Sequence, residues 1–175
     1  MAVLLAWVAG GAAAASKPVV TVSEHAGRYA VHGEFATAAS PGIAWAVLTD
    51  YARIDSFVTS MKESEVERLP GGRLKVRQVA VAGVFPFHRT LHLRLDVTED
   101  PRRRIEFVDE SGEDFAHYAG AWALRADSAA TQVTYTLDAV PRQGAPSRIS
   151  RSVMRHGATE LLEQVRAEME RRARR

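Results

Sequence analysis

Turn-forming residues recur at short, nearly regular intervals along the middle of the chain, and they limit its fold more than any other feature. They separate six stretches that read as strands, at residues 61–69, 73–82, 88–98, 104–110, 115–124 and 132–140. No helical pattern lies between these stretches. Parallel strands need long crossover connections, whereas antiparallel strands can be joined by short turns. The sequence therefore predicts an antiparallel meander.

The residues before this meander predict further elements. Pro18 to Ser23 reads as a strand, and Tyr29 to Thr37 as its continuation or its hairpin partner. Ser40 followed by Pro41 is a strong helix start, because serine caps the first turn and the missing N–H of proline costs nothing there. Tyr51 to Val58 carries the apolar face of a second short helix.

A long amphipathic helix ends the chain. It is expected to begin at Ser147 as the N-cap and to run to about Arg172. Its apolar stripe repeats every three or four residues, at Ile149, Val153, Met154, Gly157, Ala158, Leu161, Leu162, Val165 and Met169. A curved sheet that wraps around such a helix usually encloses a cavity, so the order of elements favours a protein that binds something apolar.

Length and composition narrow the classes of function. The 175 residues are enough for one domain with a sizeable core, and no repeat or linker divides residues 16–175. The net charge of +2 gives no support to nucleic-acid binding. The absence of cysteine excludes disulfides, thiolate nucleophiles and cysteine-ligated metal sites.

Residues 1–15 differ in character from the rest. A short apolar run, Ala2 to Val8, is followed by Gly10-Gly11 and an alanine tract in which Ala13 and Ala15 fit a signal-peptidase pattern. The run is too short to span a bilayer, and no basic residue precedes it. We interpret it as a signal peptide or disordered leader, with a first core strand as the alternative. Cleavage would make the protein periplasmic or secreted; without cleavage it would be cytoplasmic.

The segment LTDYARIDSFVTSMKESEV, residues 48–66, is the most specific motif in the chain. With the order strand, two short helices, strands and long helix, it resembles the START-type (SRPBCC, helix-grip) superfamily. The likeness is strongest to bacterial polyketide cyclase/dehydrase-like and coenzyme Q-binding START-type proteins. It implies an α+β fold in which a curved antiparallel sheet of about six or seven strands wraps around the C-terminal helix. It also implies a cavity for lipids, quinones, sterols or polyketides.

Strand phase selects the side chains that would line this cavity. The candidate ligand-binding residues are Arg89, Leu91, Leu93, Phe107, Tyr118, Trp122, Tyr135, Val153 and Gly157. Arg89 is the one charge in phase with the leucines of its strand, so it either anchors a polar ligand group or reaches water at a strand end. The tyrosines and Trp122 either hydrogen-bond a ligand or are ordinary core aromatics.

Two further features point to the same cavity. Gly157 costs the helix about 1 kcal/mol relative to alanine, so close approach of a ligand or of the Trp122 ring would explain it. Phe85 and Phe87 lie in a loop, and we expect them either at the cavity rim, where they could touch a membrane surface, or folded back as a lid.

No catalytic, metal-binding or cofactor signature is present. The histidines are scattered, and no HExxH, GxSxG or glycine-rich phosphate motif occurs. The favoured interpretation is a binder or carrier of an apolar small molecule without metal, cofactor or nucleic acid. The alternatives are a polyketide cyclase or dehydratase, with Tyr118, Tyr135, His117 or Arg89 as acid or base, and a protein-interaction module with a closed core.

The leader generates the first prediction. Protein isolated from the producing cell should begin at Ser16, because signal peptidase cleaves after small residues such as Ala13-x-Ala15. N-terminal sequencing measures this directly. An intact Met1 in cytoplasmic protein would contradict export.

Overall fold

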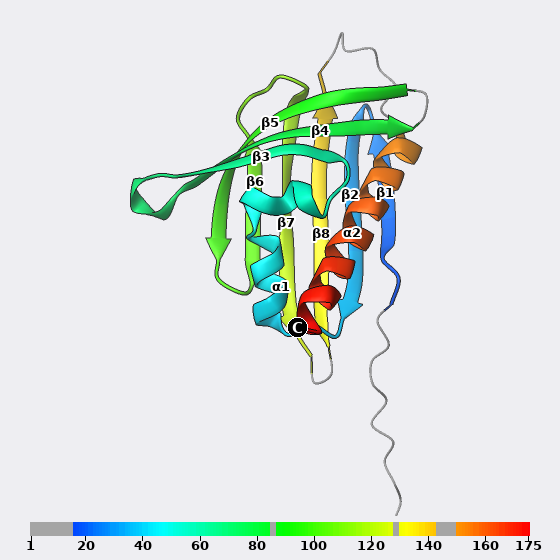
Figure 1. Cartoon of the computed structure of the whole chain (residues 1–175). Helices are drawn as coiled ribbons and strands as arrows, with labels where there is room; N and C mark the ends of the chain where they lie inside the picture. Colours follow the sequence, from blue (N-terminus) through cyan, green and yellow to red (C-terminus); the bar gives the residue numbers. More distant parts are fainter. Residues whose placement is uncertain (1–15, 85–86, 128–129, 143–149) are drawn as a thin grey trace, which may run out of the picture.

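The computed structural model describes residues 16–84, 87–127, 130–142 and 150–175, and these form one antiparallel sheet with helices on its concave side (Figure 1). The strands are β1 (Val19–His25), β2 (Arg28–Thr37), β3 (Met61–Arg68), β4 (Leu74–Val84), β5 (Phe87–Asp100), β6 (Arg104–Asp109), β7 (Phe115–Ala126) and β8 (Thr131–Pro141). The helices are α1 (Pro41–Leu48), the 3-10 helices η1 (Tyr51–Ser56) and η2 (Pro70–Gly72), and α2 (Arg151–Ala173).

The sheet order is β1-β2-β8-β7-β6-β5-β4-β3, and every pairing is antiparallel. The predicted meander is therefore confirmed from β3 to β8. The one long-range pairing joins β2 to β8, with Tyr29 opposite Ala139 and Thr37 opposite Thr131. This pairing brings the N-terminal hairpin beside the last strand, so that α1, η1 and α2 all lie over the same concave face.

The described residues contain eight strands, whereas the sequence suggested about six or seven. The difference lies in β1 and β2, because the sequence did not decide whether these residues form one continuous strand or the two strands of a hairpin. Ala26 and Gly27 have φ angles of 49° and 78°, the left-handed conformation of a two-residue hairpin turn. His25 pairs with Arg28 across this turn. The local backbone conformation therefore makes them a hairpin.

Both α-helices begin at serine caps, but only one of these caps was predicted correctly. Ser40 Oγ accepts a hydrogen bond from the backbone N–H of Ile43 at 3.3 Å, as expected. The N-cap of α2 is Ser150, whose Oγ accepts from Val153 N–H at 3.2 Å. The predicted cap Ser147 was wrong, and it lies outside the described residues. Two serines three residues apart are both good caps, so the sequence alone did not separate them.

The C-terminal half of α2 is the part that packs against the sheet. Its buried residues are Ala158, Leu162, Val165, Glu168 and Met169. Leu162 reaches the sheet at Gly33 of β2, where an added Cβ would come within 2.6 Å of Leu162 Cδ2. Glycine at this position lets the helix approach the sheet closely. Among the described residues, no helix has both the length and the apolar composition needed to cross a bilayer.

A cluster of ion pairs holds the end of α2 to α1 and η1. Glu168, with 6% of its side chain exposed, binds Arg171 and Arg172 at 2.6 and 2.7 Å. Arg172 also binds Asp50 at 2.7 Å, and its guanidinium lies 5.8 Å from the centre of the Phe57 ring. Hydrogen bonds from Arg171 and then Arg172 lower the pKa of Glu168 to about 2.

This pKa predicts an acid-dependent contribution to stability. The folded state holds Glu168 ionised, so its contribution is present above the ordinary carboxyl pKa of 4.5 and is lost as pH falls towards about 2. Glu168→Gln should lower the free energy of unfolding by about 2 kcal/mol at neutral pH. The difference in the free energy of unfolding between this variant and the wild type should become smaller in acid. Urea unfolding across pH measures this.

Glu163→Gln is the matched control, because Glu163 is exposed on the same helix. It should change the free energy of unfolding by less than about 0.5 kcal/mol. A Glu168→Gln effect that did not vary with pH would mean that the lost packing, and not the charge, is responsible.

Candidate functional site

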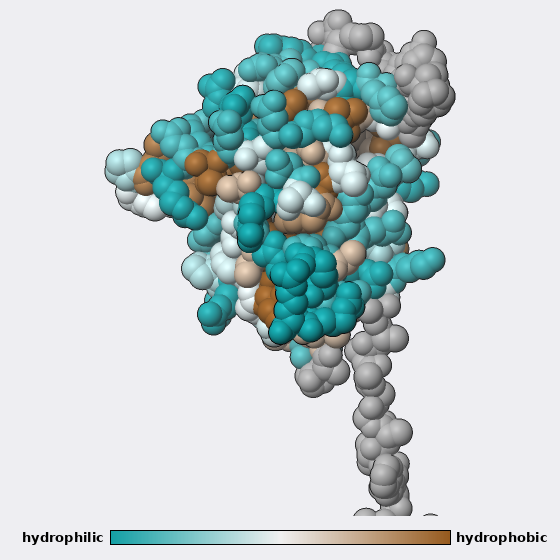
Figure 2. All heavy atoms as spheres, viewed as in Figure 1, coloured by the Kyte–Doolittle hydropathy of each residue, from teal (hydrophilic) through white to brown (hydrophobic). Residues whose placement is uncertain are grey.

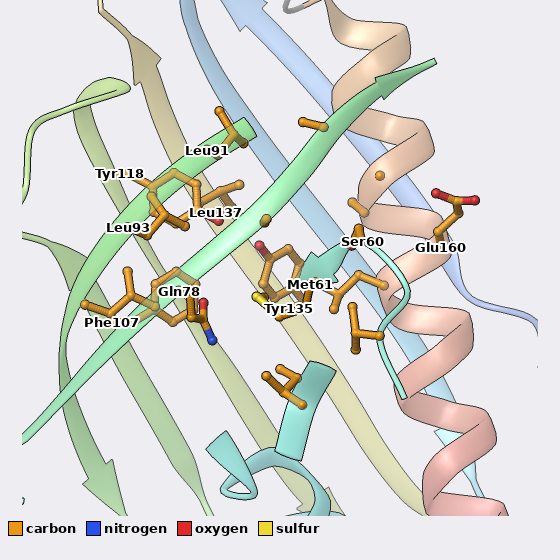
Figure 3. A pocket seen from close by; sticks show the side chains of 18 of the residues that line it. Ser60, Met61, Gln78, Leu91, Leu93, Phe107, Tyr118, Tyr135, Leu137 and Glu160 are labelled. Atoms are coloured by element: carbon orange, nitrogen blue, oxygen red, sulfur yellow. The ribbon is translucent and has the colours of Figure 1, made fainter. Parts of the chain in front are cut away.

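A cavity of about 220 Å³ lies between the concave face of the sheet and the N-terminal half of α2. Strands β4 to β8 form its floor and far wall, while η1 and the segment after it close one end. Apolar side chains make up most of its surface. Figure 3 shows Gln78, Leu93, Phe107 and Tyr118 on one side, Tyr135 and Met61 in the middle, and Ser60 beside α2.

Alternation along β5 and β7 explains why these residues face inward. In β5, Leu91, Leu93, Leu95 and Val97 are buried while their neighbours face outward. The cavity is lined by all the predicted ligand-binding residues except one, namely Leu91, Leu93, Phe107, Tyr118, Trp122, Tyr135, Val153 and Gly157. The structure brings them together around one space. Their binding of a ligand stays a prediction.

Arg89 is the exception, because it is not part of the described cavity lining. Its guanidinium forms a close ion pair with Asp114, whose side chain is 9% exposed. Asp114 Oδ2 also accepts a hydrogen bond from the backbone N–H of His92 at 2.8 Å. Burial raises the pKa of Asp114, but these hydrogen bonds outweigh it and hold the pKa below its usual range. The arginine therefore has a structural partner that fastens the loop before β7 to β5.

The predicted rim is not described. Phe85 lies outside the described residues, and of Phe87 only the backbone, at the start of β5, is described. Contact of this region with a membrane surface stays a prediction. Figure 2 shows a largely hydrophilic surface on the helix side, with hydrophobic residues visible along the β3–β4 hairpin and around the segment between η1 and β3.

Gly157 lies at the opening of the cavity with open space in front of it. An added Cβ would have nothing within 4 Å, and the residue is exposed. Of the two alternatives for this glycine, close approach of the Trp122 ring is therefore ruled out. Trp122 instead packs against Tyr135, with ring centres 4.6 Å apart. Space for a ligand at Gly157 stays a prediction.

The aromatic wall is built around a second glycine, Gly120 of β7. A Cβ at Gly120 would lie 2.3 Å from the backbone oxygen of Thr136 and 2.6 Å from Cζ of Phe107. The Phe107 ring therefore lies directly on the strand, with the Tyr118 and Tyr135 ring centres 6.0 and 6.4 Å away. Glycine at this position recesses the aromatic ring, which leaves room above it.

Tyr118 and Tyr135 line the same part of the cavity, and each hydroxyl group influences the pKa of the other. Burial raises the pKa of Tyr118 to about 12, although the hydrogen bond from Tyr135 lowers it in part. Burial first, and then the neighbouring Tyr118, raises the pKa of Tyr135 well above its usual value. Both phenols are therefore neutral near pH 7, and they act as hydrogen-bonding groups rather than bases.

Gln78 is the polar residue that the sequence analysis missed. It is 7% exposed, lines the cavity from β4 and pairs in register with Leu93 of β5. Its amide nitrogen donates a long hydrogen bond of 3.5 Å to Ser64 Oγ. The strand period could have identified it, because Leu74, Val76 and Gln78 are two residues apart and therefore lie on the same face of β4.

The opening also contains residues that the sequence did not single out. Ser60, Gly83, His156 and Glu160 line both the cavity and a shallower hollow next to it. His156 Nε2 lies 3.5 Å from Glu160 Oε2. Helical spacing places both residues next to Gly157, one residue before it and three residues after it. That spacing was the signal that could have found them.

Charge is confined to this opening. Within the described lining, His156 and Glu160 are the only residues other than the tyrosines that titrate. Tyr51 also lines the cavity, but its hydroxyl already donates to Glu99 Oε1 at 2.7 Å, and burial raises its pKa. The described residues contain no group of three His, Cys, Asp or Glu side chains that could hold a metal ion.

The fold and its cavity define a START-type protein of the SRPBCC superfamily. Residues 28–174 match the family described as polyketide cyclase / dehydrase and lipid transport, and the chain belongs to this family. A comparison with curated proteins found no match.

Solved structures agree with the fold. TTHA0849 from Thermus thermophilus is similar with a TM-score of 0.70 at 18% identity, covering 82% of this chain and 99% of that one. The Zhui aromatase/cyclase from Streptomyces sp. R1128 has a TM-score of 0.66 at 23% identity, covering 83% and 95%. The STAR-related lipid transfer protein from Xanthomonas axonopodis has a TM-score of 0.60 at 15% identity, covering 88% and 99%.

The two glycines generate opposite predictions for the same substitution. Gly120→Ala should lower the free energy of unfolding by about 1–3 kcal/mol, because the new methyl group meets backbone and the Phe107 ring. Gly157→Ala should raise it by up to about 1 kcal/mol, because it meets nothing and improves helix propensity. Denaturant unfolding of both variants measures the contrast. Equal effects at the two sites would contradict this description of the wall.

Proposed function

We propose that this protein binds and carries an apolar small molecule, such as a lipid, quinone or polyketide-like compound, in the cavity under α2. The observation that carries the proposal is an open space inside the fold whose wall is mostly Leu, Val, Ile, Phe and Met. An interaction module with a closed core would have filled this space. Removing apolar ligand surface from water yields about 25 cal/mol per Å², which is the driving force for binding.

The uncharged interior supports a carrier over a cyclase or dehydratase. An acid–base enzyme needs a group that changes its protonation state near the operating pH. His117 and Arg89 do not line the described cavity, which leaves Tyr118 and Tyr135 of the four candidates. Their raised pKa values disfavour proton abstraction by either phenol. The similar Streptomyces protein is an aromatase/cyclase, and this likeness keeps the enzyme as the second proposal.

Gly157 provides the test of binding in this cavity. N-phenyl-1-naphthylamine is a neutral dye that brightens in apolar surroundings, and it should bind the wild-type protein. Gly157→Leu should reduce this binding at least tenfold, because the new side chain enters open space at the opening. The protein should stay folded, since nothing within 4 Å of the Cβ position is displaced. Fluorescence titration and circular dichroism measure the two quantities.

Glu163→Leu is the control, because it adds the same side chain to an exposed position of α2 outside the cavity lining. It should leave dye binding unchanged. Equal binding by wild type and Gly157→Leu would contradict a ligand site at this opening.

A further inference from the structure

The cavity contains polar groups whose hydrogen-bonding capacity is only partly used. Gln78 is the clearest case. The nitrogen of its side-chain amide makes the long contact with Ser64, and no hydrogen bond from the described residues reaches its amide oxygen. Whichever way the amide is turned, one end faces the cavity without a protein partner. This end is open to the cavity, so a ligand group or water can bind it there.

The Tyr118–Tyr135 pair also has a hydrogen-bond donor that the described residues leave unused. Two hydroxyl groups that face the same cavity carry two hydrogens, and a hydrogen bond between Tyr118 and Tyr135 can use only one of them. No hydrogen bond of the described residues uses the other hydrogen, whereas the Tyr51 hydroxyl is already bound to Glu99. The pair therefore presents one donor to the cavity. Donation within the pair strengthens that donor, because linked hydrogen bonds polarise one another.

These groups come from different walls of one space. Gln78 projects from β4, Tyr118 from β7 and Tyr135 from β8, and Figure 3 shows all three around the same cavity. The interior between them has no ionised side chain among the described lining, and His156 and Glu160 lie only at the opening. An ionised ligand group would therefore be buried without an opposite charge, which is strongly unfavourable.

We propose that the ligand is an uncharged molecule whose apolar body carries hydroxyl or carbonyl groups, bound by Gln78 and by the Tyr118–Tyr135 pair, and that carboxylate-bearing lipids are rejected. This inference rests on the proposed function, because it specifies what the same cavity holds. Gln78 accepts from a ligand hydroxyl or donates to a carbonyl, and the tyrosine pair donates to a carbonyl oxygen.

A matched series of small naphthalenes tests the proposal by displacement of N-phenyl-1-naphthylamine at neutral pH. The series consists of naphthalene, 2-naphthol, 2-acetylnaphthalene and 2-naphthoate, which share one apolar body and differ in the polar group. The alcohol and the ketone should displace the dye about tenfold more strongly than naphthalene. The carboxylate should be weaker than naphthalene, because its charge must leave water.

Single substitutions assign each preference to its residue. Gln78→Met should remove most of the advantage of the alcohol, and Tyr118→Phe most of the advantage of the ketone, because Tyr135 donates to Tyr118 and leaves the Tyr118 hydrogen for the ligand. Naphthalene binding should stay within about threefold in both variants. Gln132→Met and Tyr29→Phe are the controls, because both residues lie on strands outside the described cavity lining. Both controls should keep the full series of preferences.

The outcomes separate the two levels of the proposal. If the dye and naphthalene do not bind at all, the proposed function fails and this inference falls with it. If the dye binds but the alcohol and ketone are no better than naphthalene, or the carboxylate binds as well as they do, the inference is overturned while the carrier function stands. Unchanged preferences in both Gln78→Met and Tyr118→Phe would also overturn it.

Discussion

The cavity lies under the N-terminal half of α2, which is less buried than the C-terminal half. Its C-terminal half buries Leu162 against Gly33, and Glu168 with Arg172 fixes the last turn to Asp50 near η1. The half that contains Val153 and Gly157 faces the open space instead (Figure 1). If the whole helix packed as closely as Leu162 does, the space would close. Curvature of the sheet and one-sided docking of the helix together make room for a ligand.

Charged and neutral polar side chains lie in different parts of the molecule. Two groups of ion pairs lie outside the cavity, one at the end of α2 and one near the start of β5, where Arg89 and Asp114 meet. Among the described lining residues, those of the interior carry no charge, and their polar groups include Gln78 and the two tyrosines. Because isolated charges are costly in an apolar surrounding, this division stabilises the fold and also limits what the cavity can accept.

Much of the site followed from the period of two along the strands. That period correctly placed Leu91, Leu93, Phe107, Tyr118, Trp122 and Tyr135 around one cavity, and the α-helical period added Val153 and Gly157. The same period wrongly placed Arg89 in the cavity lining. Arg89 shares the phase of the leucines but lies near the strand end, where it forms an ion pair with Asp114 from the loop before β7. A pairing between residues that are far apart in sequence has no local signal.

The sequence by itself determined the element order, the antiparallel sheet, the cap at Ser40 and the inward faces of the strands, because turn chemistry and side-chain period are local properties. Only the tertiary structure decided which residues meet across the cavity, because such contacts depend on strand register and helix docking. Gln78 is a binding candidate because the pairing of β4 with β5 places it opposite Leu93, next to the cavity. Gly157 proved to face open space and not Trp122, since the tilt of α2 over the sheet sets the distance between them.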